Sequence, residues 1–557
     1  DVYKRQVPAP GGVMRPMTLQ PIRQQEVYEP VEITGPKPGM FVVDFGQNIA
    51  GVVSLDLPDG MEAGTRVVLR HAEELNEDGT LFTEPLRGAK QTDTYIAAGD
   101  ERDLEEWMPE FTYHGFRYVE VTGLAALEPE DIRAVALHTD IQKRSSFTCG
   151  SAMLNAIQQN LLMTEKDNLH SILTDCPQRD ERFGWLNDLS ARIYQTVYNV
   201  DLSRFIPKFV QDIADTQTEK GEIADTAPYY TGGVPADPVC VIYLLLARYA
   251  YRYYGNDAVC KEHYEGLKAW TEYLKSRSDG YIMEYYYYGD WVLPFPETVV
   301  PDNLFVSTVY LFWHLREMSA IARIAGREED AADYARQAEE AKKAINARYF
   351  DEKTCAYARG TQTENALAVS LGICEEKYRA RVAENVYRDA VARNHHCTSG
   401  NVGYRHVFYV LASYGYADEV IAILKNPEYP GWGFMIEKDA GSVWERWEYG
   451  MTNEMHSFNH PMFGSYDAFF YKFLGGIDVC EDAFGADRIT VAPVFVRSVD
   501  RVKTTFRTPR GLVVSEWQRE GNTVRARVEI PPQTRAEVTV GGETKILSCG
   551  SYRFEVK

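Results

Sequence analysis

Residues 174–188 read Thr174-Asp175-Cys176-Pro177-Gln178-Arg179-Asp180-Glu181-Arg182-Phe183-Gly184-Trp185-Leu186-Asn187-Asp188. This stretch places four acids, two arginines and one tryptophan within fifteen residues. Pro177 and Gly184 prevent one continuous helix through it. Such a combination suits a sugar-binding site, because carboxylates exchange protons and an indole packs on the apolar face of a sugar ring. A capped helix start with a solvated run of charge is the alternative interpretation.

Length and charge narrow the class of protein. The chain has 557 residues, enough for two to four domains. A net charge of −22 argues against nucleic acid or an anionic membrane surface as a partner. No run approaches the roughly 18 apolar residues of a membrane span. The chain begins at Asp1 rather than at Met, so an upstream portion, and with it an export signal, is not accounted for.

The cysteines indicate the compartment. Nine of them are spread along the chain without a CxxC motif or a close pair. An odd number without a disulfide framework favours a reducing, cytoplasmic location. His71-Ala72-Glu73 has the HxE spacing of zinc deaminases, but no Pro-Cys-x-x-Cys follows it. We therefore expect no metal site.

Working outward from the charged stretch, the two ends of the chain have strand character. Short, partly alternating runs divided by Gly and Pro-Asp-Gly turns predict a β-sandwich in residues 1–145. Short strands return in residues 478–557, which predicts a small C-terminal β-sandwich with Gly541-Gly542 as a hairpin turn.

The middle of the chain, residues 146–477, has helical periodicity. Several of the helices adjoin through two or three residues and so form antiparallel pairs. Twelve helices in six hairpins predict a closed (α/α)6 barrel, with a solenoid as the alternative. The expected helices are 151–169, 186–199, 201–217, 238–255, 258–277, 303–326, 327–350, 364–374, 375–393, 402–415, 417–427 and 460–474.

Loops at one rim of such a barrel carry the chemistry, because the helical framework binds nothing by itself. Four connections are unusually rich in acids and aromatic residues. They are the opening stretch, Tyr288-Gly289-Asp290-Trp291, the segment from Trp432 to Glu448 with Trp444-Glu445-Arg446-Trp447, and His456-Ser457-Phe458-Asn459-His460.

Glu181 and Glu445 are 264 positions apart, near the two ends of the helical region. Closure of the barrel would bring them across one cleft, whereas a solenoid would hold them far apart. Two carboxylates facing each other across an aromatic-lined cleft are the minimum apparatus for glycoside hydrolysis. No GxSxG elbow, phosphate loop or dinucleotide fingerprint offers a competing chemistry. For each acid taken singly, a structural salt bridge is the competing interpretation.

The residues resemble a known family at this point. Asp175-Cys-Pro-Gln-Arg-Asp-Glu-Arg-Phe-Gly-Trp185 resembles the DCPQRDERLGW signature of bacterial α-L-rhamnosidases, glycoside hydrolase family 78. The resemblance extends from about residue 40 to the C-terminus. Other matching segments are Asp44-Phe-Gly-Gln-Asn48, Arg70-His-Ala-Glu73, Thr92-Asp-Thr-Tyr95, Phe111–Glu120, Tyr288–Trp291, Trp432–Glu437, Trp444–Trp447 and Ser457–His460.

The resemblance implies an (α/α)6 barrel that releases terminal α-L-rhamnose with inversion and without a cofactor. By position, Glu181 resembles the general acid and Glu445 the general base that activates water. The partner is then a rhamnosylated glycoside or oligosaccharide, and assembly into homo-oligomers is left open. The implied substrate-binding residues are Asp175, Arg179, Trp185, Asp188, Asp290, Trp291, Trp432, Trp444 and His460.

One segment departs from the family pattern. Where the family commonly has Pro-Ala-Trp-x-Asp, this chain reads Gly232-Gly233-Val234-Pro235-Ala236-Asp237-Pro238, without the tryptophan. We align Asp237 to the family acid. The missing aromatic contact allows a barrel enzyme for a different sugar. Two further interpretations are a catalytically weak carbohydrate-binding homologue and an assembly protein whose aromatic loops form an interface.

Overall fold

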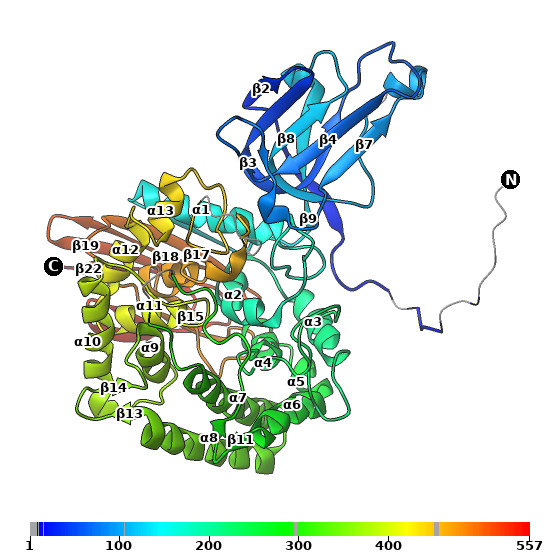
Figure 1. Cartoon of the computed structure of the whole chain (residues 1–557). Coiled ribbons are helices and arrows are strands. Elements are labelled where there is room, and N and C mark those ends of the chain that lie inside the picture. The colour runs from blue at the N-terminus through cyan, green and yellow to red at the C-terminus, as the bar shows by residue number, and fades with distance from the viewer. Residues whose placement is uncertain (1–7, 9–10, 15, 105, 295–298, 450–455) are drawn as a thin grey trace.

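The computed structural model describes residues 8, 11–14, 16–104, 106–294, 299–449 and 456–557. A domain of strands precedes a domain of helices, and a second group of strands follows, as the sequence predicts (Figure 1). The first seven residues of the expected N-terminal domain lie outside the described residues. In the described part of the chain, none of the helices combines the length and apolar character needed to cross a membrane.

The N-terminal domain is built on a seven-stranded sheet of order β1-β9-β3-β8-β4-β7, with β2 paired to β3. The long strand β3 changes partner along its length, from β2 at Asp44 to β9 at Gly51. A Cβ on Gly51 would lie 2.1 Å from the Val135 carbonyl oxygen, so this crossing requires glycine. The strands are β1 (Ile22–Tyr28), β2 (Glu32–Lys37), β3 (Met40–Leu55), β4 (Arg66–Ala72), β5 (Glu74–Leu75), β6 (Leu81–Phe82), β7 (Thr92–Ile96), β8 (His114–Thr122) and β9 (Ile132–Thr139).

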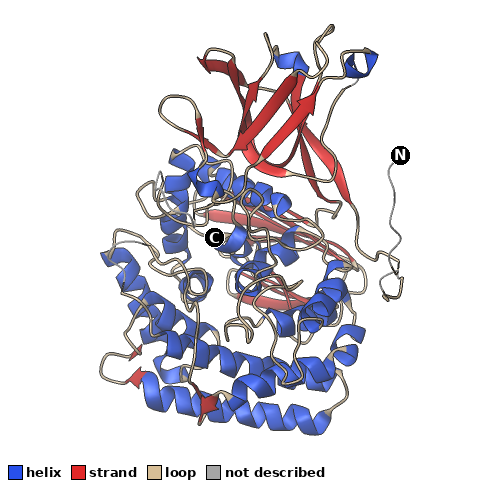
Figure 2. Ribbon diagram, turned by 45° about the vertical axis from the view of Figure 1, so that its right-hand side comes forward, coloured by secondary structure: helices blue, strands red, loops and turns tan. Residues whose placement is uncertain are grey.

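The helical domain lies below this sheet domain, which stands at one end of it (Figure 2). Two short hairpins, β11 (Ser278–Asp279) with β12 (Ile282–Met283) and β13 (Phe350–Asp351) with β14 (Ala356–Tyr357), connect helices. The helices are α1 (Ala152–Asp167), α2 (Leu186–Asn199), α3 (Phe205–Ala214), α4 (Ile242–Tyr254), α5 (Ala258–Glu262), α6 (Tyr264–Ser276), α7 (Asn303–Ile324), α8 (Glu328–Tyr349), α9 (Gln362–Ser370), α10 (Glu376–Ala392), α11 (Tyr404–Ser413), α12 (Ala417–Lys425), α13 (Trp432–Glu437) and α14 (Asp467–Phe469).

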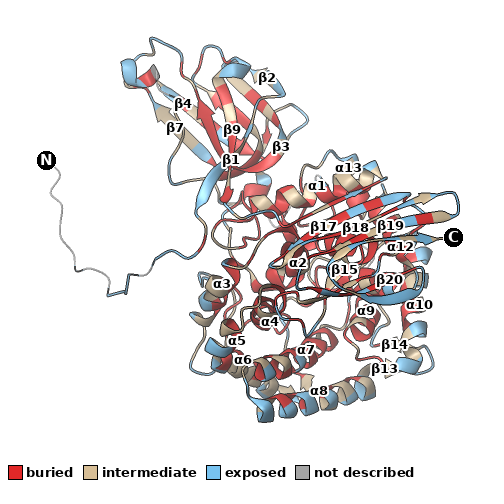
Figure 3. Ribbon diagram, turned by 180° about the vertical axis from the view of Figure 1, so that it is seen from behind, coloured by how far each residue is buried: buried red, intermediate tan, exposed pale blue. Residues whose placement is uncertain are grey.

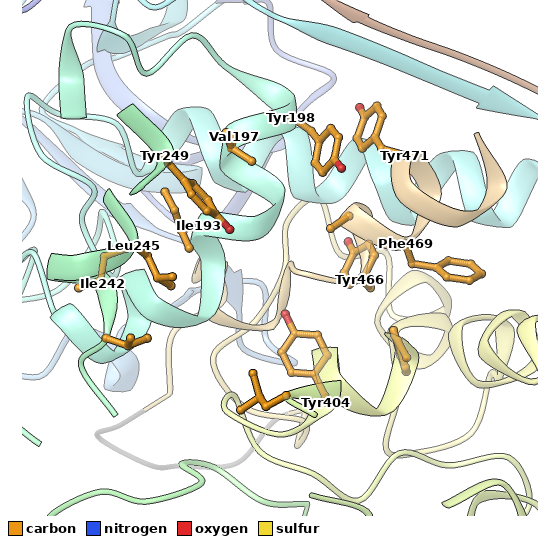
Figure 4. Packing of buried hydrophobic residues seen from close by; sticks show 14 of the residues in the cluster. Ile193, Val197, Tyr198, Ile242, Leu245, Tyr249, Tyr404, Tyr466, Phe469 and Tyr471 are labelled. Atoms are coloured by element: carbon orange, nitrogen blue, oxygen red, sulfur yellow. The ribbon is translucent and has the colours of Figure 1, made fainter. Parts of the chain in front are cut away.

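The inner helices form a closed ring. Each inner helix contacts the next in the order α2, α4, α7, α9 and α11. The helix α14 and the turn before it contact α2. The hydroxyl of Tyr404 on α11 donates to the Met462 carbonyl at 3.1 Å and also accepts from Ser465 N–H, which joins the last two members. Tyr404, Tyr466 and Tyr249 lie around the interior of this ring (Figure 4). The expected barrel closure is confirmed, and the solenoid interpretation is wrong.

The outer helices include α8, whose outward face is exposed over much of its length (Figure 3). The predicted helix at 186–199 is confirmed at both ends, since α2 spans Leu186–Asn199. The ring buries one apolar stripe of this helix, formed by Leu186, Leu189, Ile193 and Val197. Two other predictions were wrong in detail. The expected helix 258–277 divides at His263 into α5 and α6, and 460–474 is a turn, the short α14 and a π-helical segment.

The C-terminal domain pairs two sheets, of order β10-β17-β18-β19-β22 and β15-β16-β20-β21. Gly541 and Gly542 form the predicted hairpin turn, both with positive φ. The first strand, β10, comes from the segment just before α1, far from the rest of the domain in the sequence. The strands are β10 (Ser145–Cys149), β15 (Ile477–Val479), β16 (Arg488–Val491), β17 (Arg501–Thr508), β18 (Gly511–Glu520), β19 (Thr523–Ile530), β20 (Arg535–Val540), β21 (Glu543–Leu547) and β22 (Gly550–Val556).

Candidate active site

The charged stretch 174–188 is a buried loop that leads into α2. Asp175 is 1% exposed and Arg179 is 2% exposed, so the interpretation as a solvated run of charge is wrong. The loop closes on itself, since Phe183 N–H donates to Asp175 Oδ1 at 2.7 Å and Asp175 N–H donates to the Phe183 carbonyl. Gly184 follows, where a Cβ would lie 2.3 Å from the Ala227 carbonyl oxygen. Burying this many charges requires that they satisfy one another.

Arg179 joins the two predicted catalytic acids. Its Nε lies 3.1 Å from Glu181 Oε2, and its Nη1 donates to Glu445 Oε2 at 2.9 Å. Both carboxylates therefore bind one planar guanidinium, although they are far apart in the sequence. Sharing one guanidinium places the two carboxylates next to each other. The pairing inferred from barrel closure is present.

Glu181 has two further partners. The indole N–H of Trp185 donates to Glu181 Oε1 at 2.6 Å. Arg87, from the loop after the short helix Glu84–Leu86 of the N-terminal domain, donates to Glu181 Oε2 at 2.9 Å and to Asp180 Oδ1 at 2.8 Å. Arg87 was not among the predicted site residues, because no local motif marks its contact with Glu181, 94 positions later.

Glu445 lies on the segment that joins α13 to the last turn of the ring. Its side chain is 2% exposed, and its backbone N–H donates to the Ser457 carbonyl at 2.8 Å. His460 N–H donates to the Val443 carbonyl at 2.7 Å, so the two arms of this loop are tied together at Glu445 and just before it. The carboxylate is thus held on a fixed backbone opposite the charged stretch.

Burial shifts the protonation of the cluster. It raises the pKa of Glu445 above the usual value, while Arg179 opposes that rise. Burial, with Glu181 as a neighbouring acid, raises the pKa of Asp175 to about 7. It likewise raises the pKa of Asp188 well above the usual range, helped by Asp175. Burial therefore favours the protonated forms of Asp175 and Asp188, whereas Arg179 counteracts this effect at Glu445, and such shifted acids are typical of sites for acid–base chemistry.

His460 completes this group. Its Nε2 lies 3.3 Å from Asp188 Oδ1. Burial and the nearby Arg179 charge lower the pKa of His460 well below its usual value, so the ring is neutral. The sequence-predicted residues Asp175, Arg179, Glu181, Asp188, Glu445 and His460 are thus brought together.

Aromatic rings border the acids on one side. Tyr288 makes edge contacts with both Trp185 and Trp291, at centroid distances of 6.0 and 5.7 Å. Trp185 and Trp291 are only partly buried, as a surface for a sugar ring requires. Tyr288 was not among the predicted site residues, although it ends the run of four tyrosines that drew attention to this loop.

Three further predicted substrate-binding residues, Trp432, Trp444 and Asp290, are also buried. Trp432 packs among rings of the barrel core, and its indole N–H donates to the Phe463 carbonyl at 2.9 Å. Trp444 is 1% exposed and contacts Phe458 edge-on. Asp290 accepts bonds from the Thr363 hydroxyl and from backbone N–H groups of 400, 402 and 403. In this structure these side chains support the rim loops, and direct sugar contact by them stays a prediction.

Asp237, aligned to a family acid, is also fully buried. Its Oδ2 accepts the backbone N–H groups of Tyr287 and Tyr288, at 2.8 and 2.7 Å. Gly232, in the same connection, lies against Trp185, where a Cβ would be 3.1 Å from the ring. Asp237 therefore holds the tyrosine loop, and the glycine turn covers one edge of Trp185.

The N-terminal domain also supports the loop of Glu445. Asn48 donates to Ser442 Oγ at 3.2 Å, and Glu73 accepts from Phe458 N–H at 3.1 Å. Asp167 at the end of α1 accepts from Ala50 N–H at 2.9 Å and from Asn459 Nδ2 at 2.8 Å. These bonds connect β3, α1 and the loop that bears Glu445. The sheet domain is therefore part of the framework of the site.

One group of potential metal ligands lies inside the cluster. Ligand atoms of Asp175, Cys176 and Glu181 lie within 4.8 Å of one another. The guanidinium of Arg179 already contacts both of these acids, at 3.8 Å for Asp175. A fixed cation beside the same oxygens disfavours a second one. We derive no step from a metal at this position.

A closed helical ring with paired carboxylates and aromatic rings at one rim defines a glycoside hydrolase type of site. Sequence profiles of three domains match in succession: the bacterial alpha-L-rhamnosidase concanavalin-like domain at 35–138, the 6 hairpin glycosidase domain at 142–474 and the C-terminal domain at 476–553. The chain belongs to the bacterial α-L-rhamnosidase family.

Individual relatives agree with this assignment. An alpha-L-rhamnosidase of Streptomyces avermitilis is 32% identical over 535 residues, covering 93% of this chain and 50% of that protein. An alpha-L-rhamnosidase structure from Dictyoglumus thermophilum superposes with a TM-score of 0.92 at 35% identity, over 96% of this chain and 64% of that one. A Streptomyces avermitilis alpha-L-rhamnosidase complexed with L-rhamnose gives 0.90 at 30% identity, over 97% and 54%. The chain spans about half the length of the curated relatives it matches.

Proposed function

We propose that this chain hydrolyses terminal α-L-rhamnosides with inversion at the anomeric carbon. The observation that carries the proposal is the pair of carboxylates, Glu181 and Glu445, on the single guanidinium of Arg179. Family membership and the relatives named alpha-L-rhamnosidase support rhamnose as the sugar. A rhamnosylated glycoside or oligosaccharide is the corresponding substrate.

Glu181 is the general acid in this proposal. It gives its proton to the glycosidic oxygen as the bond from that oxygen to the anomeric carbon breaks, and the aglycone leaves as an alcohol. Trp185 N–H bonds to one carboxyl oxygen and the two arginines contact the other, so the carboxyl plane is fixed before the sugar arrives. Fixed orientation of the donor lowers the barrier to proton transfer.

Glu445 is the general base. It accepts a proton from a water molecule whose oxygen bonds to the anomeric carbon from the opposite face, which inverts the configuration. The positive charge of Arg179, which donates to Glu445 Oε2, favours the ionised form of this buried carboxylate. After the reaction Glu445 holds a proton taken from the water and Glu181 has given its own to the leaving alcohol, and exchange with solvent restores both groups.

The remaining polar groups suit the hydroxyls of the sugar. Asp175, Asp188 and His460 offer acceptors and donors beside the two glutamates. Trp185, Tyr288 and Trp291 form an apolar side for the ring and its C6 methyl group. The second candidate is a hydrolase for another terminal sugar, which the glycine turn in place of the family tryptophan favours.

The two candidates separate in a direct assay. We expect 4-nitrophenyl α-L-rhamnoside to be cleaved, with β-L-rhamnose appearing first in a proton NMR time course. A panel of aryl glycosides of other sugars should give much lower kcat/KM. First appearance of the α-anomer would overturn inversion, and preference for another sugar would establish the second candidate.

A further inference from the structure

Three side chains of the N-terminal domain converge outside the proposed active site. His71 lies at the end of β4, Asp93 on β7 and His114 at the start of β8, and these strands are neighbours in the order β8-β4-β7. One ligand atom from each residue lies within 4.8 Å of the others. Two imidazoles and one carboxylate are a common ligand set for transition metals.

The distances are close to those around an ion. Asp93 Oδ2 lies 2.9 Å from His114 Nε2 and 3.8 Å from His71 Nε2. Nitrogen and oxygen ligands at about 2.0–2.2 Å from zinc stand roughly 3–4 Å from each other. The two imidazole rings are stacked, with centroids 4.2 Å apart and an interplanar angle of 25°, and Nε2 of each ring lies near the same carboxylate oxygen.

The second nitrogen of each ring is already held. Nδ1 of His71 lies 3.0 Å from the Gln91 carbonyl oxygen, and Nδ1 of His114 lies 3.2 Å from Gln91 Oε1. Both partners are oxygens that only accept, so each Nδ1 carries its proton and donates. This arrangement leaves Nε2 as the ligand atom, and metal-binding histidines are typically oriented by such a bond.

His71 has an electrostatic mismatch that a cation would resolve. Its ring is fully buried. Among the described residues, its Nε2 has no hydrogen-bond partner. This nitrogen instead lies 3.8 Å from Asp93 Oδ2. A buried nitrogen without a partner beside a carboxylate is unfavourable unless a positive charge lies between them.

We propose that His71, Asp93 and His114 form a binding site for a divalent transition-metal ion, with Zn²⁺ as the best-matched ion. Imidazole nitrogen suits zinc, whereas calcium and magnesium prefer oxygen ligands. The ion would take the place between the two Nε2 atoms and the Asp93 carboxylate, and any proton shared by His114 and Asp93 would be released to solvent. Asp93 is only partly buried, so an ion can reach the site from solvent.

The position of the site gives it a structural role. Gln91, which orients both histidines, also accepts from Arg182 Nη2 at 3.4 Å. The same segment carries Arg87 to Glu181, so an ion at Asp93 would stiffen the connection between the sheet domain and the catalytic stretch. The proposal does not depend on the sugar or on the reaction, because its ligands belong to the N-terminal domain alone.

Metal content of the full chain tests the proposal. The purified protein is freed of metal with a chelator, incubated with Zn²⁺, dialysed and analysed by mass spectrometry of elements. We expect one zinc ion per chain and a melting temperature at least about 2 °C higher than without metal. Co²⁺ in place of zinc should give visible absorption bands that belong to a nitrogen–oxygen ligand set.

Two site variants and one control complete the test. Asp93→Asn and His114→Gln should each lose the bound ion and the thermal shift, while circular dichroism shows that they fold. His395→Gln should keep both, since His395 pairs with Glu419 of α12 in the helical domain, whereas the proposed ligands belong to the N-terminal domain. Failure of the unaltered chain to retain zinc or cobalt overturns the proposal. Retention of a full equivalent by folded Asp93→Asn does so too.

Discussion

Arg87 of the sheet domain binds Glu181 of the helical domain, with 2.9 Å between its Nη2 and Glu181 Oε2. The proposed acid thus has two arginines on one oxygen, one from each domain. The catalytic unit of this chain is therefore larger than its ring of helices.

Replacement of Glu181 tests the proton donor. Glu181→Gln should lower kcat/KM on unactivated rhamnosides by about 10²–10⁴-fold, because the leaving oxygen then departs without a proton. The loss should be much smaller for a 2,4-dinitrophenyl leaving group, which needs no protonation. Rates on both substrates measure the difference. Exposed Glu219→Gln is the control, and an equal loss on both substrates would contradict the role of acid.

Replacement of Glu445 tests the base. Glu445→Gln should reduce kcat by about 10²–10⁴-fold on all leaving groups alike, because the attacking water is no longer deprotonated. Added azide should restore turnover and yield a glycosyl azide of inverted configuration, which NMR identifies. A rescued product of retained configuration would instead assign a covalent mechanism.

The acidic limb of the pH profile follows from the burial of Glu445. Its pKa in the folded protein lies above the ordinary 4.5, and the base must be ionised to work. Activity should therefore fall as the pH decreases, starting at a pH above that expected for an exposed glutamate. The pH dependence of kcat/KM measures this limb. Arg179→Lys should move the limb upward and cost about 10²-fold, because the ammonium cannot hold both carboxylates. An unchanged limb in that variant would contradict the electrostatic role of Arg179.

Arg87 tests the contribution of the sheet domain. Arg87→Ala should lower kcat/KM by about tenfold through loss of orientation of Glu181. Arg66→Ala, an exposed arginine of β4, is the matched control and should leave kcat/KM unchanged. Unchanged kcat/KM in folded Arg87→Ala would contradict a role for Arg87 in orienting Glu181.

Asp167 gives a prediction for stability. Burial raises its pKa to about 7 in the folded chain, against 3.8 as the usual value. The folded state thus holds a proton that the unfolded state has lost, so the free energy of unfolding should fall as the pH rises from about 4 to about 7. Asp167→Asn should flatten this decline in melting experiments across that range. Exposed Asp59→Asn should retain it, and an unchanged slope in Asp167→Asn would contradict the assignment.

Periodicity and motif order predicted much of this molecule. The apolar stripe of α2 defines its two ends, and ring closure follows from the number of helix pairs, so the meeting of Glu181 and Glu445 could be inferred. The break at His263 could not, since the apolar pattern continues through it into Trp270 and Leu274. Arg87 was also beyond reach, because its contact depends on how two domains meet rather than on any local pattern.

The burial of Trp432 and Trp444 shows a related limit. Composition identified the loops near the acids, but it does not distinguish an indole that faces a ligand from one that packs behind the loop. Both are large, apolar and close to Glu445. Trp432 bonds to the Phe463 carbonyl and Trp444 packs against Phe458, whereas Trp185 is partly exposed. Only these contacts in the folded chain distinguish the two buried indoles from Trp185.

The strand β10 has a consequence for how the chain is made. Ser146 on this strand shares a hydrogen bond with Thr505, 359 positions later. At about 5–20 residues per second, a ribosome needs roughly 20–70 s to supply that partner. During this interval the strand before the first helix has an unpaired edge, and the helices fold behind it. A nascent chain that stops short of β17 (Arg501–Thr508) therefore leaves the edge of β10 open to pairing with a wrong strand. Only synthesis of the last domain supplies the strand that covers this edge.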